Sequence, residues 1–274
     1  MDGKKALAEL GSTVTYQATV TFGRGSENVT FHDKLGTGLT FNGNDKVIVE
    51  RSDAANYTIK TTPDKGDTLT ISFEDSFVEN AKVTITYTAT VNSDALTVDT
   101  GKNTATVSYG YGEESTPSET NVYNAKFTVT SKAESENGDP LAGVGFVIKN
   151  ASGKYYQKKE NKVNWVASID DATEYTSDAN GAVPAFTGLA NGTYTLEEKT
   201  VPTGYNKVED FEFTVSEHDY RTKNLEQFTT VVNVAGSLLP STGGIGTTMF
   251  YVIGAILVLG AGVLLVTRKR MSEK

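Results

Sequence analysis

The 274-residue chain has no cysteine and only two histidines. Without cysteine there can be no disulfide framework, no thiol catalysis and no cysteine-ligated metal. The two histidines, His32 and His218, lie far apart in the sequence, and neither has a second histidine or a carboxylate at ligand spacing. We therefore expect both to be solvated or edge-strand residues, and the sequence predicts no metal and no cofactor.

Positive charge is also scarce. The formal net charge is −9 and the pI is about 4.9, which argues against a nucleic-acid partner, because phosphate backbones are bound by clustered Lys and Arg. The chain contains no P-loop, no HExxH and no GxSxG motif. These absences favour a protein that is not an enzyme.

Before residue 249 no segment has a sustained helical period. Residues 12–22 instead alternate, with Val14, Tyr16, Ala18, Val20 and Phe22 on one face, which is the period of a half-buried strand. Similar segments rich in Thr, Val, Ile and Tyr follow at 46–50, 57–60, 68–73, 82–91 and 103–110. Turn-forming clusters separate them, as expected for an all-β sandwich.

A polar, turn-rich stretch at 110–118 indicates a domain edge, and a new strand is expected from about Tyr123. A second set of strand-like segments follows at 126–131, 143–150, 154–159, 192–200, 211–215 and 227–234. The prediction is two Ig-like β-sandwich domains in tandem, residues 1–122 and 123–237, followed by a single C-terminal transmembrane helix.

The predicted transmembrane helix covers the uncharged, apolar residues 249–266. In the tail at 267–274, the basic cluster 268–270 should stay cytoplasmic, which places the rest of the chain outside the cell. Export requires a signal, yet the first residues lack an apolar run of the required length. We therefore expect that the sequence is incomplete at its N-terminus or that its start is assigned too far downstream.

The sequence just before the apolar segment is Leu239-Pro240-Ser241-Thr242-Gly243. An LPxTG motif, an apolar stretch and a short basic tail, in this order, resemble a sortase sorting signal, here residues 238–274. The resemblance implies that a sortase cysteine attacks the Thr242 carbonyl, cleaves the bond to Gly243 and passes the acyl group to an amine. The implied location is the cell surface, with the protein anchored to the cell wall.

The second domain resembles the B-type repeat domain of collagen adhesins and pilins. The resemblance is carried by Lys132 with the following PLAG at 140–143, by YTLEE at 194–198 with PTGY at 202–205, and by Asn233 ahead of the sorting signal. It implies an isopeptide bond from the Lys132 amine to the Asn233 carboxamide, with Glu198 as catalytic acid. Burial supports this chemistry, because it favours a neutral amine and a protonated carboxyl.

Two alternatives stay open in the second domain. Glu197 is a second candidate for the acid, although the spacing of the tyrosine and proline motifs selects Glu198. Strict alternation from Phe127 and Val129 makes Ser131 the inward residue, so Lys132 needs a bulge or the opposite face to reach the core.

The first domain more loosely resembles the middle domain of SpaA-type backbone pilins, through DKL at 33–35, ITYTA at 85–89 and NTAT at 103–106. An A-type bond is implied there, with Asp33 as acid, Asn103 as acceptor and Lys4 or Lys5 as amine.

These features together predict a structural pilus subunit of a Gram-positive bacterium, joined by a sortase to a neighbouring pilin or to peptidoglycan. The alternative is the stalk of a wall-anchored adhesin that binds a host extracellular-matrix ligand. A YPK-type motif would favour the pilin. Residues 122–126, VYNAK, resemble this motif only distantly, and their pattern is typical of a strand.

Overall fold

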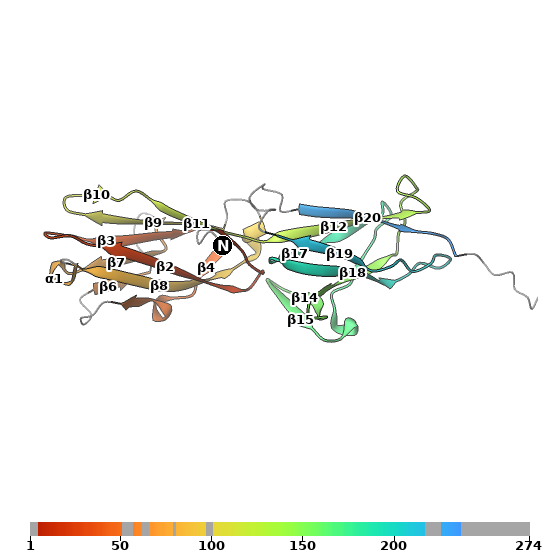
Figure 1. Ribbon diagram of the computed structural model, residues 1–274, viewed down its shortest axis with the longest axis horizontal. Coiled ribbons are helices and arrows are strands. Elements are labelled where there is room, and N and C mark those ends of the chain that lie inside the picture. The colour runs from red at the N-terminus through yellow and green to blue at the C-terminus, as the bar shows by residue number, and fades with distance from the viewer. Residues whose placement is uncertain are drawn as a thin grey trace, which may run out of the picture. The chain divides into compact units, whose positions relative to one another are not determined.

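The computed structural model describes residues 5–50, 57–61, 66–78, 81–96, 101–216 and 226–236. Within them the chain is all-β and forms two sandwiches, as the alternating pattern predicts (Figure 1). Helical structure among these residues is limited to the short α1 (Asp75–Val78) and the 3-10 turns η1 (Asn44–Lys46), η3 (Ser93–Leu96) and η4 (Ile169–Asp171). None of these helices is long and apolar enough to cross a membrane, and the span predicted at 249–266 lies outside the described residues.

The first sandwich packs two sheets around one core. In the larger sheet the strand order is β1 (Lys5–Leu7), β11 (Ser118–Tyr123), β9 (Lys102–Tyr109), β3 (Thr30–Leu35), β7 (Leu69–Phe73) and β6 (Tyr57–Lys60), and β10 (Glu113–Glu114) pairs with β9. In the smaller sheet the order is β2 (Thr13–Thr21), β8 (Lys82–Val91) and β4 (Leu39–Phe41), and β5 (Ile48–Glu50) pairs with β8.

Strand β8 shows how sequence alternation builds this core. Its odd-numbered residues are all buried and its even-numbered residues are exposed or partly so, from Lys82 to Val91. The buried residues pack against Phe31, Leu69 and Ile71 of the opposite sheet. Because alternate side chains point to opposite faces, this one pattern places both the core residues and the tyrosine Tyr87 inside the sandwich.

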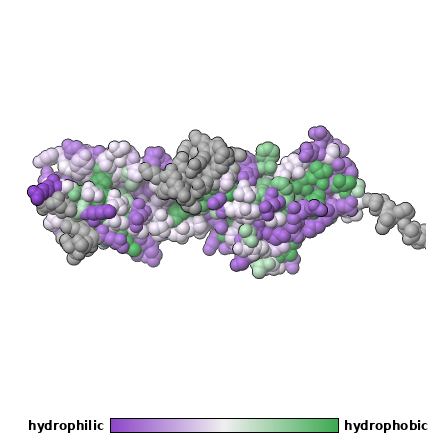
Figure 2. Space-filling model, in the orientation of Figure 1, coloured by the Kyte–Doolittle hydropathy of each residue, from purple (hydrophilic) through white to green (hydrophobic). Residues whose placement is uncertain are grey.

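The second sandwich is built in the same way from two sheets. One has the order β17 (Ala182–Leu189), β12 (Ala125–Ala133) and β20 (Glu226–Asn233). The other has the order β15 (Lys162–Val166), β14 (Tyr155–Lys159), β13 (Gly145–Asn150), β18 (Gly192–Thr200) and β19 (Phe211–Val215), with β16 (Tyr175–Thr176) paired to β13. Figure 2 shows a surface that is largely hydrophilic or neutral with scattered hydrophobic patches, and large exposed apolar side chains include Tyr111 and Phe228.

In each sandwich the first described strand pairs in parallel with the last one. Strand β1 pairs with β11, and β12 pairs with β20. The β12–β20 register is unbroken from the Lys126–Glu226 pair to the Ala133–Asn233 pair. This pairing decides which side chains of the two terminal strands share a face, and therefore which can contact one another.

All of the segments predicted as strands contain a strand, but several strands were missed. The missed ones include β3, β11, β15 and β17, which are short, polar or interrupted by proline and glycine. The strand expected from about Tyr123 begins at Ala125, because Tyr123 is the last residue of β11 and still belongs to the first sandwich.

A short segment of the first sandwich is bonded to the second, and both belong to one compact unit. The Leu10 backbone donates to the Gly188 carbonyl and accepts from the Val163 amide, at 3.2 and 3.0 Å. Leu10 is 1% exposed, and the Trp165 indole donates to Glu9 at 2.8 Å. The two sandwiches are therefore joined by packed side chains and hydrogen bonds as well as by the peptide chain.

Gly188 leaves no room for a side chain at this joint. It has φ +78°, and a Cβ there would lie 2.5 Å from the Leu10 Cβ, whereas Gly153, at φ +73°, has no neighbour within 4 Å. We expect Gly188→Ala to lower the free energy of unfolding by about 1–3 kcal/mol more than Gly153→Ala, because only the first adds overpacking to the cost of the positive φ. Thermal unfolding of the two variants tests this, and equal Tm values would contradict it.

Candidate functional sites

The first candidate site lies between the sheets of the first sandwich. Asp33 on β3 and Asn103 on β9 come from adjacent strands, in which Asp33 pairs with Ala105 and Leu35 with Asn103. Both predicted site residues are buried, at 1% and 3% exposure. The structure thus brings together the acid and the acceptor that the sequence predicts.

Tyr87 joins these two side chains from the opposite sheet. Its hydroxyl donates a short hydrogen bond to Asp33 Oδ2 and accepts one from Asn103 Nδ2 at 2.8 Å. Tyr87 was not predicted as a site residue, although it is the central residue of ITYTA at 85–89. Its place in that motif and its inward position on a predicted strand were the available signals.

Burial controls the electrostatics of this site. Desolvation raises the pKa of Asp33 from 3.8 to about 6, against the opposing effect of the hydrogen bonds from Tyr87 and Asn103. Desolvation and the nearby Asp33 charge also raise the pKa of Tyr87 and of Tyr16. A carboxyl in this state keeps a protonated fraction near neutral pH and can act as a general acid.

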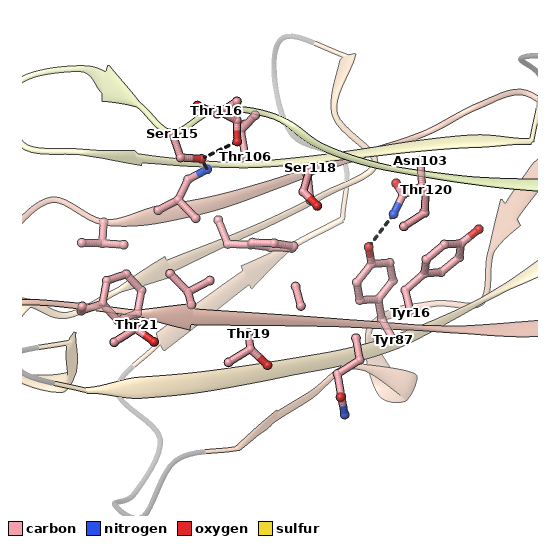
Figure 3. A pocket seen from close by; sticks show the side chains of 18 of the residues that line it. Tyr16, Thr19, Thr21, Tyr87, Asn103, Thr106, Ser115, Thr116, Ser118 and Thr120 are labelled. Atoms are coloured by element: carbon pink, nitrogen blue, oxygen red, sulfur yellow. Dashed lines mark hydrogen bonds between the residues drawn. The ribbon is translucent and has the colours of Figure 1, made fainter. Parts of the chain in front are cut away.

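A cavity of about 840 Å³ opens beside the site (Figure 3). Apolar residues of β2 and β9 line much of it, and Tyr16, Tyr87, Asn103 and Thr120 gather at one end. Three buried atoms there, Tyr16 Oη, Asn103 Oδ1 and Thr120 Oγ1, have no hydrogen-bond partner among the described residues. Because unpartnered buried polar atoms are costly, this end of the cavity is suited to a further polar group.

The predicted amines lie at the start of the chain. Lys5 is the first residue of β1 and pairs with Asn121, while Lys4 lies outside the described residues. Ala6, the next residue of β1, lines the cavity.

The second candidate site is a buried acid–amide pair in the second sandwich. Asn233 Nδ2 donates to Glu198 Oε1 at 2.8 Å, and the Val208 amide donates to Glu198 Oε2 at 2.7 Å. Glu198 is 1% exposed and Asn233 is fully buried. The structure brings these two predicted residues together from opposite sheets, because β18 and β20 belong to different sheets.

Glu197, the alternative acid, points elsewhere. Its carboxylate contacts Lys149 at 3.1 Å, Lys207 at 3.5 Å and the Tyr155 hydroxyl at 3.1 Å. Although partial burial acts to raise the pKa of Glu197, the hydrogen bond and charge of Lys149 hold it below its usual value. This geometry leaves Glu198 as the acid that contacts Asn233.

Lys132 is not brought to this pair. Residues of β12 alternate without interruption, so Phe127, Val129 and Ser131 are buried while Lys132 is half-buried beside Val232. Ser131 is fully buried, and its hydroxyl has no hydrogen-bond partner among the described residues. The structure therefore has no bulge on the β20 side of β12 that would turn Lys132 inward.

Other predicted residues have ordinary partners or lie outside the described residues. Lys126, from the segment that distantly resembles YPK, forms an exposed ion pair with Glu226 at 2.8 Å. His32 hydrogen-bonds with Asp67 and Ser108. The motif at 239–243 and His218 lie outside the described residues. No group of three or more potential metal-ligating side chains occurs in the part of the chain that the structure describes.

Two parts of the chain match known protein families. Residues 125–227 match the SpaA prealbumin-like fold domain, and residues 232–273 match the LPXTG cell wall anchor motif. The chain is 25% identical to the trypsin-resistant surface T6 protein of Streptococcus pyogenes over 365 aligned positions, which cover 98% of this chain and 67% of that protein.

Solved pilus proteins share the fold. The group B streptococcus pilus 2b backbone protein superposes with a TM-score of 0.71 at 23% identity, covering 86% of this chain and 98% of that one. The full-length major pilin RrgB of Streptococcus pneumoniae superposes with a TM-score of 0.65 at 16% identity, covering 86% of this chain and 72% of that one.

These matches define the class of the protein as a cell-wall-anchored surface protein that carries a sortase motif and a SpaA-type domain. Within that class the chain is homologous to the T6 protein and shares the fold of streptococcal pilus backbone proteins.

The raised pKa of Asp33 predicts a pH dependence of stability. Between about pH 4 and pH 6 the folded chain binds a proton that the unfolded chain has released, so stability from this group is complete below pH 4 and is lost as the pH rises through 6. Relative to Asp33→Asn, which cannot titrate, the wild type should lose on the order of 3 kcal/mol between pH 4 and pH 7.

Urea unfolding of both proteins across this pH range measures the difference. The exposed loop variant Glu136→Gln serves as a control that should parallel the wild type. A constant difference between the wild type and Asp33→Asn would contradict the assignment.

Proposed function

We propose that the chain is a structural subunit of a Gram-positive surface pilus. The observation that carries this is the order of its parts, a SpaA-type domain at 125–227 directly followed by an LPXTG anchor at 232–273. Homology to the T6 protein along almost the whole chain supports a pilin over the stalk of an adhesin, because the solved structure of the T6 protein is that of a backbone pilin. The chemistry that we propose for the protein is its own cross-linking and attachment, and we propose no metabolic reaction for it.

Attachment would proceed through the motif at 239–243. A sortase cleaves between Thr242 and Gly243, and the Thr242 carbonyl passes to an amine of a neighbouring pilin or of peptidoglycan. A transmembrane helix at 249–266 and the basic tail would hold the precursor at the membrane until cleavage.

Replacing residues 239–243 by alanines should therefore abolish attachment. We expect the variant to remain in the membrane fraction or the medium, whereas the wild type fractionates with the wall or as a high-mass ladder. Fractionation of cells that express each protein at equal levels measures this. Wall attachment of the alanine variant would contradict the sortase assignment.

The Asp33–Asn103 pair is proposed as an isopeptide site that stabilises the first domain. Protonated Asp33 would polarise the Asn103 carboxamide while an amine attacks, and ammonia would leave. The cavity end with three unpartnered polar atoms is where the amine would lie.

Two lysines just before Ala6 in the sequence are candidates for the amine. Ala6 lines the cavity, and it belongs to β1, which pairs with β11. We therefore propose Lys4 or Lys5 as the amine of the first domain.

For the second domain the proposed acceptor and acid are Asn233 and Glu198, supported by their buried hydrogen bond. Lys132 is the amine that the family resemblance implies, but its outward position on β12 gives it no geometric support. Any such bond between terminal strands would carry tension around the domain core, and by analogy with a disulfide closing about 100 residues it would contribute on the order of 4–5 kcal/mol.

The first-domain bond predicts a specific mass. Release of ammonia should leave a peptide that links Asn103 to Lys4 or Lys5, about 17 Da lighter than the sum of its parts. Asp33→Ala should lose this peptide, and one of Lys4→Arg and Lys5→Arg should lose it while the other keeps it, which identifies the amine. Peptide mapping of the full chain, produced without a sortase and purified in detergent, tests this. A wild type without any linked Asn103 peptide would overturn the first-domain proposal.

A further inference from the structure

The second sandwich holds an acid and an amide positioned for cross-linking, and the inward residue that faces the same core is a serine. We propose that Ser131 occupies the attacking position of the second domain, so that the wild-type domain stays without its cross-link and a lysine at this position would complete it. This inference rests on the proposed isopeptide chemistry and names the residue that decides whether it occurs.

The first argument is the face that Ser131 shares with Asn233. On β20 the inward residues are Val231 and Asn233, and on β12 they are Phe127, Val129 and Ser131. Ser131 pairs with Val231, so Asn233 is its diagonal neighbour on the same face. Diagonal neighbours in a sheet lie about 7–8 Å apart, a span that a long side chain covers and a serine does not.

The second argument is that the register of β12 is held on both sides. Along β20 it is paired up to the Ala133–Asn233 pair. On the other side the Ser131 amide donates to the Gly181 carbonyl at 2.7 Å, and the Ser131 carbonyl accepts from the Leu141 amide at 3.1 Å. Turning Lys132 inward would shift the strand by one residue and break these bonds, since a one-residue slip moves every side chain to the other face.

The third argument is the space available beside the acid. A cavity of about 190 Å³ is lined by Glu198, by the apolar side chains of Phe146 and Leu196, and by Val231, the register partner of Ser131. Ser131 does not itself line this cavity, and a longer side chain at position 131 would reach it past Val231. The apolar lining would favour the neutral, nucleophilic form of the amine, against the effect of the carboxyl groups of Glu198 and Glu209, which also line the cavity.

The reaction would be an amide exchange. The neutral amine of the new lysine attacks Cγ of Asn233, a C–N bond forms, and the bond from Cγ to Nδ2 breaks. Glu198 moves one proton from the attacking nitrogen to Nδ2, so that ammonia leaves and the carboxyl is regenerated. No oxidant or other reactant is needed.

The same geometry implies that the terminal strands of the wild-type second domain are held together without a cross-link, unlike those of a cross-linked domain. Without a covalent link, β12 and β20 are joined by the hydrogen bonds of their parallel pairing, by the exposed Lys126–Glu226 ion pair and by the hydrogen bond from the Thr128 hydroxyl to the Gln227 carbonyl. Glu198 then acts as a structural acceptor that joins β20 to the segment around Val208.

The test compares Ser131→Lys with Ser131→Arg in the full chain, produced without a sortase and purified in detergent. Arginine adds a similar long cation but its guanidinium cannot form this amide. We expect Ser131→Lys to yield a peptide joining residues 131 and 233, about 17 Da lighter than its parts, with Ser131→Arg and Ser131→Lys/Glu198→Ala unlinked. The linked variant should also gain several degrees in Tm over Ser131→Arg.

Peptide maps of the wild type provide the second measurement, which needs no variant to fold. An unlinked Asn233 peptide is the expected result, and a peptide joining Lys132 to Asn233 would overturn the inference while sustaining the isopeptide proposal. A folded Ser131→Lys chain that stays unlinked would also overturn it. The first-domain peptides in the same maps report separately on the proposed function, so the two failures are distinguishable.

Discussion

The parallel pairing of the first and last strands is the constraint on which both sandwiches depend. Between β12 and β20 an unbroken register from Lys126 to Ala133 decides which residues of the two strands face the core. It brings the carboxamide of Asn233 to Glu198 of the opposite sheet, and it turns Lys132 away. Because side chains alternate strictly along a strand, Lys132 cannot face the core while the register of β12 with β20 is kept.

The two sandwiches use the same kind of buried acid–amide pair in different surroundings. In the first, Tyr87 lies between Asp33 and Asn103, and burial raises the pKa of Asp33 to about 6. In the second, Glu198 contacts Asn233 directly and takes a backbone amide on its other oxygen. Hydrogen bonds offset part of the cost of burying these polar groups. In the first sandwich the compensation is incomplete, because Asp33 Oδ1 and Asn103 Oδ1 have no hydrogen-bond partner among the described residues.

The two sandwiches are joined by direct contacts as well as by the peptide chain. The Glu9–Gly11 segment of the first sandwich is hydrogen-bonded to β15 and to Gly188 of the second, with Leu10 fully enclosed. Small residues at Gly11 and Gly188 allow this approach, because a Cβ at either would collide with the other domain. Load entering one sandwich would thus reach the next through a packed joint in addition to the peptide link.

Much of this protein could be predicted from sequence. Period-2 alternation identified strands such as β2, β8 and β18, since burial of one face leaves a direct trace in residue order. The cell-surface location and the pilin-type second domain followed from motifs at 239–243 and 194–205, which are contiguous in the chain. A motif whose residues are contiguous in the chain can be recognised without knowing the fold.

What only the tertiary structure decided is which distant residues meet. It placed Glu198 rather than Glu197 against Asn233, added Tyr87 to the Asp33 site, and set Ser131 instead of Lys132 on the core face. The resemblance alone assigned Lys132 by its spacing from the following PLAG residues, and spacing along a strand is insensitive to a shift of one position. The face to which each side chain of β12 points is decided by the pairing with β20, a strand about one hundred residues away. The local sequence around β12 does not identify that partner.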